Sequence, residues 1–376
     1  MKIGIIGTRG IPNQYGGFEQ FAENFSTRMV ERGHDVTVYI SHRHPYKSDH
    51  YKNVRLIRCY DPEYLMGTAG QFIYDFNCIR NSREHNFDVI LQLGYTSSTI
   101  WSWLYPEGSI LVTNMDGLEW SRAKYNKWTQ HFLTHAEKWG VNHSDYLIAD
   151  SKGIQDYLLK KYNTKAVLIP CGADIYETKK GDIQTLHKFS VKSNEYDLLI
   201  ARYEPENNIE TILKAYATAK NRELVLIGNF KNTSFGHRMY RDYGGYAHIH
   251  FAGPVYEVKQ LNVLRYHSRL YMHGHSVGGT NPSLLEAMAC NALICAHDNL
   301  FNRYVLGDDA FYFKEASELS SLISAPLNKE NHENWLYNNK QKIYDDYNWN
   351  SITGKIENYF NQWKYGEKYQ EVLCAV

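Results

Sequence analysis

The stretch KIGIIGTRGIPNQYGGFEQFAENFSTRMVERG, residues 2–33, decides the fold of this chain. It begins with a short apolar run, which is typical of a strand buried on both faces of a parallel sheet. A glycine-rich loop follows at residues 7–17, and the apolar spacing over residues 18–32 predicts an amphipathic helix. A strand, a glycine loop and a helix in this order indicate an α/β domain that binds a ligand at its first turn.

The same alternation of apolar runs and helical patterns continues along the chain. Strands are expected at residues 2–7, 35–40, 54–59, 88–94, 109–115, 145–151 and 166–172, and again at 196–203, 223–230, 249–253, 269–274 and 292–297. Helices are expected at residues 18–32, 121–141, 152–162, 208–220, 257–267 and 283–290. Two successive β/α series predict two Rossmann-like domains with parallel sheets, which face each other across a cleft.

The domain boundary is expected in the polar segment 174–195, which has no strand signal. The N-terminal domain would then span residues 1–180 and the C-terminal domain residues 190–350. Residues 351–376 form a helical tail, which we expect to pack back on the N-terminal domain.

Composition excludes several classes of partner. Lys plus Arg and Asp plus Glu both number 41, so no net charge favours nucleic acid. The six cysteines include no C-x-x-C pair, which argues against a zinc site or a disulfide framework and for a reducing compartment. The sequence shows no signal-peptide pattern and no apolar run of about 20 residues, so a cytoplasmic protein is expected.

The opening loop GTRGIPNQYGGFE, residues 7–19, is a candidate anion site. Its amides and the start of the following helix are available to a negative group, and Gly16 and Gly17 allow close backbone approach. The spacing of Gly4, Gly7 and Gly10 is not the dinucleotide fingerprint, and no Gly-Lys-Ser/Thr follows. A glycine-rich turn that serves only the chain path is the alternative.

The second candidate is MHGHSVGGTNPSLLEAMAC, residues 272–290. A strand runs into a glycine loop, and Pro282 then opens a helix, where proline is favoured. Free amides before this helix form an anion site, and Glu286 lies one turn inside, where it can accept hydrogen bonds from hydroxyl groups. A phosphate beside a sugar or ribose fits both halves of the motif. The alternative role of Glu286 is to cap its own helix.

These motifs resemble those of a known family. GGTNPSLLEAMAC (278–290) resembles the donor-site motif of retaining glycosyltransferases of the GT-B fold, family 4, and LIARYEPENNIETILKAY (199–216) resembles their second phosphate-binding segment. DYLIADSKGIQDYLLKKY (145–162) and VLIPCGADI (167–175) are similar to the inter-domain segment. With NMDGLEWSRAKYNKW (114–128) and FNRYVLGDDAFYF (301–313), the chain is similar to bacterial rhamnosyltransferases of polysaccharide assembly, which use dTDP-L-rhamnose.

The resemblance implies that the C-terminal domain binds the nucleotide sugar. Arg202 matches the family arginine that neutralises the diphosphate, and Glu286 matches the glutamate that meets the ribose. Two family residues are replaced: Gly278 stands where a first glutamate is usual, and Asn207 or Asn208 stands where a lysine is usual. The sugar would therefore be held partly by the backbone amides of Gly279, Thr280 and Asn281. His273 and His275 are expected to line the pocket or to support its loop.

The N-terminal domain would bind the acceptor. Arg9 is the candidate for the missing cation, beside Gly16 and Gly17. The family's catalytic-loop histidine is absent, and Asp116 and Glu119 lie in its region. Asp116 would orient an acceptor hydroxyl or take its proton, whereas simple turn formation by the Asp-Gly dipeptide is its alternative role. The residues expected to act in catalysis are Asp116, Arg202 and Glu286.

The resemblance implies a retaining transfer of L-rhamnose to a lipid-linked saccharide in surface polysaccharide assembly. No Asp-x-Asp occurs, so no metal and no cofactor are expected, and the leaving group would be stabilised by arginine, amides and helix N-termini. We favour a front-face displacement. Peripheral contact with the inner membrane face would involve residues 64–80, for which a buried helix is the alternative. Transfer of glucose, N-acetylhexosamine or fucose, and a non-catalytic nucleotide-sugar-binding protein, remain alternative functions.

Overall fold

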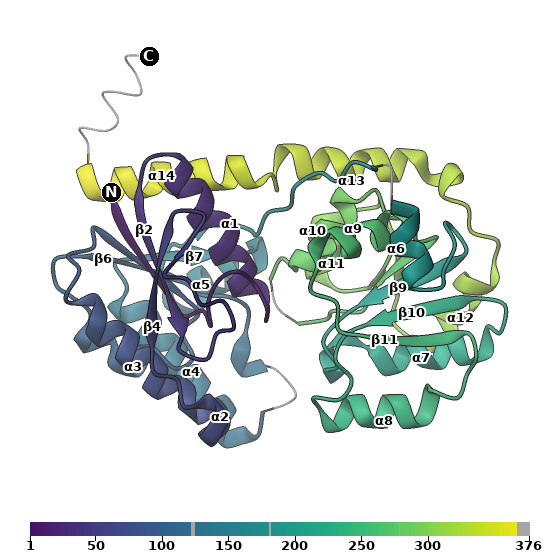
Figure 1. Ribbon diagram of the computed structural model, residues 1–376, viewed down its shortest axis with the longest axis horizontal. Coiled ribbons are helices and arrows are strands. Elements are labelled where there is room, and N and C mark those ends of the chain that lie inside the picture. The colour runs from purple at the N-terminus through teal and green to yellow at the C-terminus, as the bar shows by residue number, and fades with distance from the viewer. Residues whose placement is uncertain (122–124, 180–181, 278, 367–376) are drawn as a thin grey trace, which may run out of the picture. The chain divides into compact units, whose positions relative to one another are not determined.

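The computed structural model forms two compact units (Figure 1). It describes residues 1–121, 125–179, 182–277 and 279–366. Within these ranges the first unit comprises residues 1–121, 125–171 and 349–366, and the second comprises residues 172–348.

The two units separate between Cys171 and Gly172, whereas the sequence analysis expected the boundary between residues 180 and 190. Backbone hydrogen bonds explain this position. The Ala173 N–H donates to the Tyr347 carbonyl over 2.8 Å, so the chain belongs to the second unit as soon as it leaves the first.

The first unit is built on an eight-stranded sheet with the order β3-β4-β2-β1-β5-β6-β7-β8. Its strands are β1 (Lys2–Ile6), β2 (Asp35–Ser41), β3 (His50–Tyr51), β4 (Val54–Cys59), β5 (Val89–Leu93), β6 (Ile110–Asn114), β7 (Tyr146–Ala149) and β8 (Val167–Leu168). All pairs are parallel except the β3–β4 pair. The strand order reverses between β1 and β5, and a crevice for ligands is expected at their carboxyl ends.

Helices cover both faces of this sheet. They are α1 (Gly17–Glu31), α2 (Glu63–Met66), α3 (Gly70–Ser82), α4 (Lys127–His143), α5 (Lys152–Tyr162) and α14 (Trp349–Tyr365), with the 3₁₀ turns η1 (Gly67–Ala69), η2 (Thr99–Leu104) and η3 (Glu119–Ser121). Figure 1 shows α1 and α14 on one side of the sheet and α2, α3 and α4 on the other.

The C-terminal helix α14 completes the core of the first unit. Its Phe360 packs edge-on against Phe25 of α1, with ring centroids 6.1 Å apart, and its Trp349 packs against Phe21 over 5.7 Å. Fully burying one large apolar side chain contributes about 1.5–3 kcal/mol. The expected return of a C-terminal helix to the N-terminal domain is therefore confirmed.

The second unit contains a parallel six-stranded sheet with the order β11-β10-β9-β12-β13-β14. Its strands are β9 (Tyr196–Ile200), β10 (Glu223–Ile227), β11 (Ile249–Gly253), β12 (Leu270–His273), β13 (Ile294–His297) and β14 (Phe311–Phe313). The strand order reverses between β9 and β12, so the loops after these two strands mark the ligand crevice of this unit.

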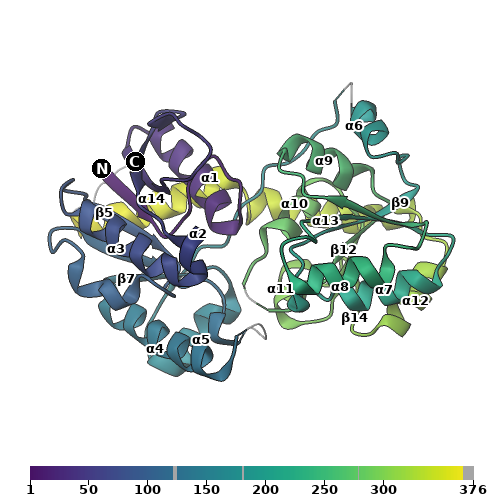
Figure 2. The ribbon, with the colours of Figure 1, turned by 60° about the horizontal axis from the view of Figure 1, so that its bottom comes forward.

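Helices again lie on both sides of the second sheet. They are α6 (Asp182–Lys188), α7 (Ile209–Thr218), α8 (Ser234–Tyr243), α9 (Val258–His267), α10 (Pro282–Ala289), α11 (Leu300–Leu306), α12 (Ala316–Ser324) and α13 (Glu333–Asp345), with the turns η4 (Pro205–Asn207) and η5 (Lys329–His332). Figure 2 shows α7, α8 and α12 along one side and α9, α10 and α13 along the other.

The α/β class with two Rossmann-like domains and parallel sheets is confirmed. The strands β3 and β14 were missed, because runs of two and three residues are too short to show a pattern. The helix expected at 121–141 begins only at Lys127, since Asn126 caps it by accepting a hydrogen bond from the Thr129 N–H over 2.9 Å. In the described part of the chain, no helix has the length and apolar character needed to cross a membrane.

Candidate functional site

The glycine loop of the first unit lies at the carboxyl end of β1 and packs closely against β5. Gly7 has a φ of +89°, and a Cβ there would lie 2.2 Å from the Leu93 carbonyl oxygen of β5. The buried carboxylate of Glu19 accepts hydrogen bonds from the Thr8 hydroxyl over 3.3 Å and from the Arg9 N–H over 2.8 Å. The loop backbone is therefore fixed at the β1–β5 crevice.

Arg9 is paired in this structure. Its Nε and Nη2 each donate to the Glu63 carboxylate over 2.8 Å, and its guanidinium lies 3.8 Å from the centre of the Tyr15 ring. The sequence analysis did not foresee Glu63, which lies 54 positions along the chain. For Arg9 to act as the second cation of a diphosphate site, the ligand must share or displace this carboxylate.

Gly16 and Gly17 form the start of α1. Gly16 is the N-cap residue in extended conformation and provides no side-chain cap, and Gly17 is the first helical residue. Because glycine has no side chain, Gly16 cannot cap the amides in the first turn of α1. This suits the predicted contact of these amides with an anion.

Asp116 and Asp150 follow the neighbouring strands β6 and β7. Asp116 adopts a left-handed φ of +49°, and its N–H donates to the Asn114 side chain over 3.0 Å. Asp150 is buried, and burial together with the charge of Asp116 raises the pKa of its carboxyl to about 8. A carboxylic acid that keeps its proton near neutral pH therefore lies at the carboxyl end of β7, and the sequence analysis did not select this residue.

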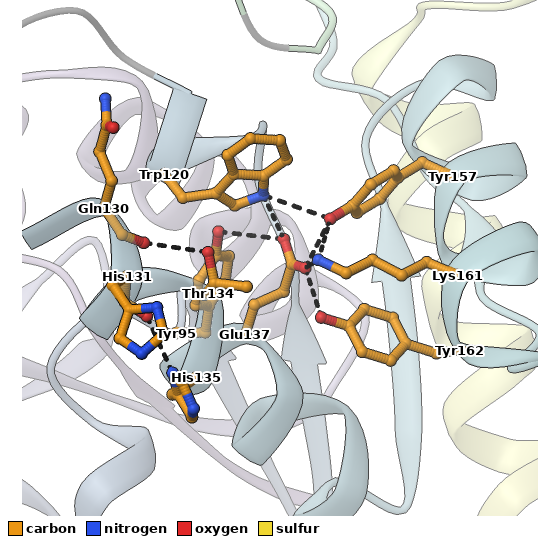
Figure 3. Close-up of polar contacts among 10 residues, drawn as sticks. All are labelled: Tyr95, Trp120, Gln130, His131, Thr134, His135, Glu137, Tyr157, Lys161 and Tyr162. Atoms are coloured by element: carbon orange, nitrogen blue, oxygen red, sulfur yellow. Dashed lines mark hydrogen bonds and ion pairs between the residues drawn. The ribbon is translucent and has the colours of Figure 1, made fainter. Parts of the chain in front are cut away.

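The loop that carries Asp116 is anchored by a buried carboxylate (Figure 3). Glu137 of α4 accepts hydrogen bonds from the Tyr157 hydroxyl over 2.7 Å, the Tyr162 hydroxyl over 2.6 Å and the Lys161 ammonium over 2.8 Å, all on or just after α5. Its other oxygen accepts from the Trp120 indole N–H over 3.2 Å.

This network fixes the loop that contains Glu119, which was predicted to bind substrate. Glu119 is itself buried, next to Trp120 in the sequence. The structure thus brings Asp116 and Glu119 onto one anchored loop at the end of β6. The carboxylate that anchors this loop was not predicted.

Arg202 follows β9 in the second unit and is exposed. Among the residues that the structure describes, neither carboxylate oxygen of the buried Glu206 has a hydrogen-bond partner, so Arg202 does not hydrogen-bond to it. Glu206 lies in the turn η4, beside the β12 loop, and its backbone carbonyl accepts from the Ser276 N–H over 3.0 Å. A buried acceptor without a donor is a ligand-binding candidate that the sequence analysis missed.

Asn207 joins the two loops of this crevice. Its amide donates to the Arg202 carbonyl over 2.7 Å, and its side-chain oxygen lies 2.8 Å from Nδ1 of His275. A Cβ on Gly274 would lie 2.0 Å from the Asn207 carbonyl oxygen, so the loops are in backbone contact. Asn207 thus positions both loops and offers no charge to a ligand.

The segment predicted to bind the donor leads directly into α10. The side-chain oxygen of Asn281 caps the helix by accepting from the Ser283 N–H over 2.9 Å, and Pro282 is the first helical residue. Thr280 is buried and Gly279 is half-buried. Gly278 lies outside the described residues. Arg202 and Asn207 therefore lie on the segment after β9, and His275, Thr280 and Asn281 lie on the segment after β12. Asn207 links the two segments through the Arg202 carbonyl and His275.

Glu286 lies on α10 and pairs with Arg265 of α9, whose guanidinium is buried. Arg265 also donates to the Ser283 hydroxyl over 3.4 Å. Since Asn281 caps the helix, Glu286 is not needed for that role. Arg265 is a further residue that sequence reasoning missed.

His273 at the end of β12 is buried, and burial lowers the pKa of its imidazole to about 3. The ring is therefore neutral at physiological pH. Among the residues that the structure describes, no three His, Cys, Asp or Glu side chains are grouped so that they could hold a metal ion.

Comparisons with protein families divide the chain in two. Residues 1–174 match the model described as Domain of unknown function (DUF1972), and residues 183–343 match Glycosyl transferases group 1. A comparison with curated proteins gives no match.

Solved structures match over nearly the whole chain. Sucrose-phosphate synthase from Thermosynechococcus elongatus is 16% identical, with full coverage of both chains and a TM-score of 0.77. HepE from Anabaena, solved with UDP and glucose, is 16% identical over 96% of this chain and 99% of its own, with a TM-score of 0.73. WaaG, a glycosyltransferase of lipopolysaccharide biosynthesis, is 15% identical over 96% and 99%, with a TM-score of 0.67.

These likenesses establish the GT-B fold. The match of residues 183–343 to glycosyl transferases group 1 supports a glycosyltransferase.

Proposed function

We propose that this chain is a retaining, metal-independent glycosyltransferase that moves L-rhamnose from dTDP-L-rhamnose to a lipid-linked saccharide in bacterial surface polysaccharide assembly. One observation carries the proposal. In the domain that matches glycosyl transferases group 1, the exposed Arg202 follows β9 and the N-terminus of α10 follows β12, with Glu286 one turn inside that helix. The strand order reverses between β9 and β12, which is where doubly wound domains bind ligands.

The second unit would bind the donor. Arg202 and the amides before α10 would stabilise the diphosphate as negative charge develops on it, which is the role of preorganised donors in metal-free transfer. Glu286 would accept hydrogen bonds from the ribose hydroxyls. The buried Glu206 would accept another hydroxyl of the donor, since its oxygens have no hydrogen-bond partner in the described part of the chain.

The first unit would bind the acceptor. Asp116 would orient the reacting hydroxyl, and the protonated Asp150 would keep the local negative charge low beside it. No residue is assigned as a covalent nucleophile, and we favour a front-face displacement in which the leaving phosphate takes the acceptor proton.

Two relatives support parts of this proposal. HepE is solved with UDP and glucose, and WaaG takes part in lipopolysaccharide biosynthesis. A nucleotide-sugar donor and a surface-polysaccharide acceptor are therefore reasonable first substrates to test.

The test is a panel of nucleotide sugars incubated with lipid-pyrophosphate saccharide acceptors, with products identified by mass spectrometry. We expect a mass increase of one deoxyhexose with dTDP-L-rhamnose. Transfer of another hexose would replace the donor assignment, and tight donor binding without transfer to any acceptor would favour a binding protein.

Arg202→Ala tests the donor site directly. A hydrogen bond to a charged group contributes about 1.5–3 kcal/mol, so the variant should raise the KM for the donor roughly ten- to a hundredfold. Arg241→Ala is the control, because Arg241 is exposed on α8 and pairs only locally with Asp242 over 2.8 Å. An unchanged KM for Arg202→Ala would contradict the assignment.

A further inference from the structure

Two exposed histidines of the first unit take no part in the candidate site described above. His131 and His135 lie on α4, and they are the only two of the 17 histidines in the sequence that are spaced four positions apart. On an α-helix, side chains at positions i and i+4 lie one above the other on the same face. Two histidines at this spacing on one helix face can bind the same zinc ion.

The two imidazole rings already lie next to each other. Their centres are 4.5 Å apart, and the ring planes are inclined by 64°. A zinc–nitrogen bond is about 2.0–2.1 Å long, so two imidazoles in neighbouring positions on one ion have ring centres roughly 4.5–5 Å apart. Figure 3 shows both rings on α4, apart from the carboxylate of Glu137. The pair therefore needs little movement to bind one ion.

A hydrogen bond to the backbone determines which nitrogen of His135 is available. Its Nδ1 lies 2.9 Å from the His131 carbonyl oxygen, which only accepts, so Nδ1 carries the proton and the neutral ring has its lone pair on Nε2. Metal-bound histidines commonly donate their second nitrogen in this way, because the bond fixes the tautomer and the ring orientation. Among the described residues, neither ring nitrogen of His131 has a hydrogen-bond partner, so this ring can offer a lone pair as well.

The surroundings of the pair favour a transition metal over a hard cation. The one acidic residue of α4, Glu137, is buried and accepts hydrogen bonds from α5. Mg²⁺ and Ca²⁺ prefer oxygen ligands, whereas imidazole suits Zn²⁺, Cu²⁺ and Ni²⁺. Lys127 and Lys138 are exposed on the same helix and repel loosely held cations. Binding at the pair must therefore come from direct coordination by the two rings.

We propose that His131 and His135 form a binding site for one divalent transition metal ion. Each ring would supply one nitrogen, and water would fill the remaining positions, because no third His, Cys, Asp or Glu among the described residues completes the group. The bound ion would link two successive turns of α4. The inference goes beyond the proposed function and does not depend on it, since neither histidine is assigned to the donor or the acceptor.

Calorimetric titration of the full chain with ZnCl₂ tests the site. His131→Gln and His135→Gln each keep one of the two imidazoles. A second linked ligand raises affinity by about 10²–10⁴, so each variant should bind Zn²⁺ roughly a hundredfold more weakly than the wild type. MgCl₂ should give no binding that depends on the pair. Zn²⁺ should raise the melting temperature of the wild type more than that of either variant, because it binds the folded helix.

His143→Gln is the matched control. His143 is exposed on the same helix, and its Nδ1 lies 2.9 Å from the Trp139 carbonyl oxygen, as Nδ1 of His135 does from the carbonyl four residues earlier. No histidine lies four positions from it in either direction. The Zn²⁺ affinity of this variant should equal that of the wild type. All three substitutions change exposed side chains, and circular dichroism checks that each variant is folded.

Electron paramagnetic resonance with equimolar Cu²⁺ counts the nitrogen ligands. We expect two imidazole nitrogens in the wild type and in His143→Gln, and one at most in His131→Gln and His135→Gln. Equal Zn²⁺ affinity of the wild type and the two pair variants would overturn the proposal. A loss in His143→Gln as large as in the pair variants, or a single nitrogen ligand in the wild type, would also overturn it.

Discussion

The carboxylate of Glu286 on α10 pairs with Arg265 on α9, a guanidinium that is buried within the second unit. The helices α9 and α10 are therefore joined by an ion pair, and the carboxylate that we propose to bind the ribose is already oriented before a ligand binds. Glu286 would therefore have two roles, since it would bind the ribose and it pairs with the buried Arg265. Variants can separate these two roles.

Glu286→Gln should reduce kcat/KM for the donor by roughly ten- to a hundredfold. The variant keeps the shape of the side chain but loses the charged acceptor, and a hydrogen bond to a charged group contributes about 1.5–3 kcal/mol. Glu286→Ala should also lower stability by about 3–5 kcal/mol, since it leaves Arg265 buried without its carboxylate. Steady-state kinetics and urea unfolding measure the two effects. The exposed Glu177, changed to Gln, should alter neither, and a fully active Glu286→Ala enzyme would refute the site.

Gly274→Ala should disturb the donor crevice without touching a charged group. Its Cβ would lie 2.0 Å from the Asn207 carbonyl oxygen, so the two loops must move apart. We expect a higher donor KM and a lower melting temperature. Gly245→Ala is the matched control, because a Cβ at Gly245 meets no atom within 4 Å. Equal behaviour of the two variants would show that the loop contact is unimportant.

The sequence predicted the crevice elements well because their signals are local. Glycines, Pro282 and apolar strands occupy consecutive positions, and each specifies its own backbone shape. The pairing of Arg9 with Glu63 could not be predicted in this way, since it depends on how α2 packs beside the first loop. An arginine selected for its position next to a glycine turn therefore has a partner that only the folded chain reveals.

Asp150→Asn should change the pH dependence of stability. The pKa of about 8 in the folded protein lies above the value of about 3.9 for an unfolded aspartate. The folded protein thus keeps a proton that the unfolded chain releases, and stability present at low pH is lost as the pH rises toward 8, at up to about 1.4 kcal/mol per pH unit.

The melting temperature of Asp150→Asn relative to the wild type should therefore rise between pH 5 and pH 8. Asp156→Asn is the control, because that carboxylate is exposed and pairs with Lys152 over 2.8 Å at the surface. A difference between Asp150→Asn and the wild type that does not vary with pH would contradict the raised pKa.

Glu137→Gln should destabilise the first unit by about 3–5 kcal/mol. The variant removes the negative charge beside Lys161. It also turns an amide toward the Tyr157 and Tyr162 hydroxyls, which donate to the carboxylate in the wild type. Urea denaturation measures the loss, with the exposed Glu107→Gln as control. A loss of less than about 1 kcal/mol would mean that the network contributes little.

The burial of Glu137 has a sequence signal that was not used. It lies on the same stripe of α4 as Leu133, Ala136 and Gly140, all of which are buried. An acid on an apolar stripe predicts a buried carboxylate with partners, but the sequence does not say which residues they are. The donors come from α5 and the β6 loop, which the fold brings together.

The return of α14 to the first unit sets an order for biosynthesis. Trp349, Ile352, Ile356 and Phe360 belong to the same core as the first strand, yet they leave the ribosome only after the whole of the second unit. At about 5–20 residues per second, the segment between residues 171 and 349 takes on the order of ten to forty seconds to translate. During that time the N-terminal half holds an uncovered apolar surface, and the second unit can finish folding first.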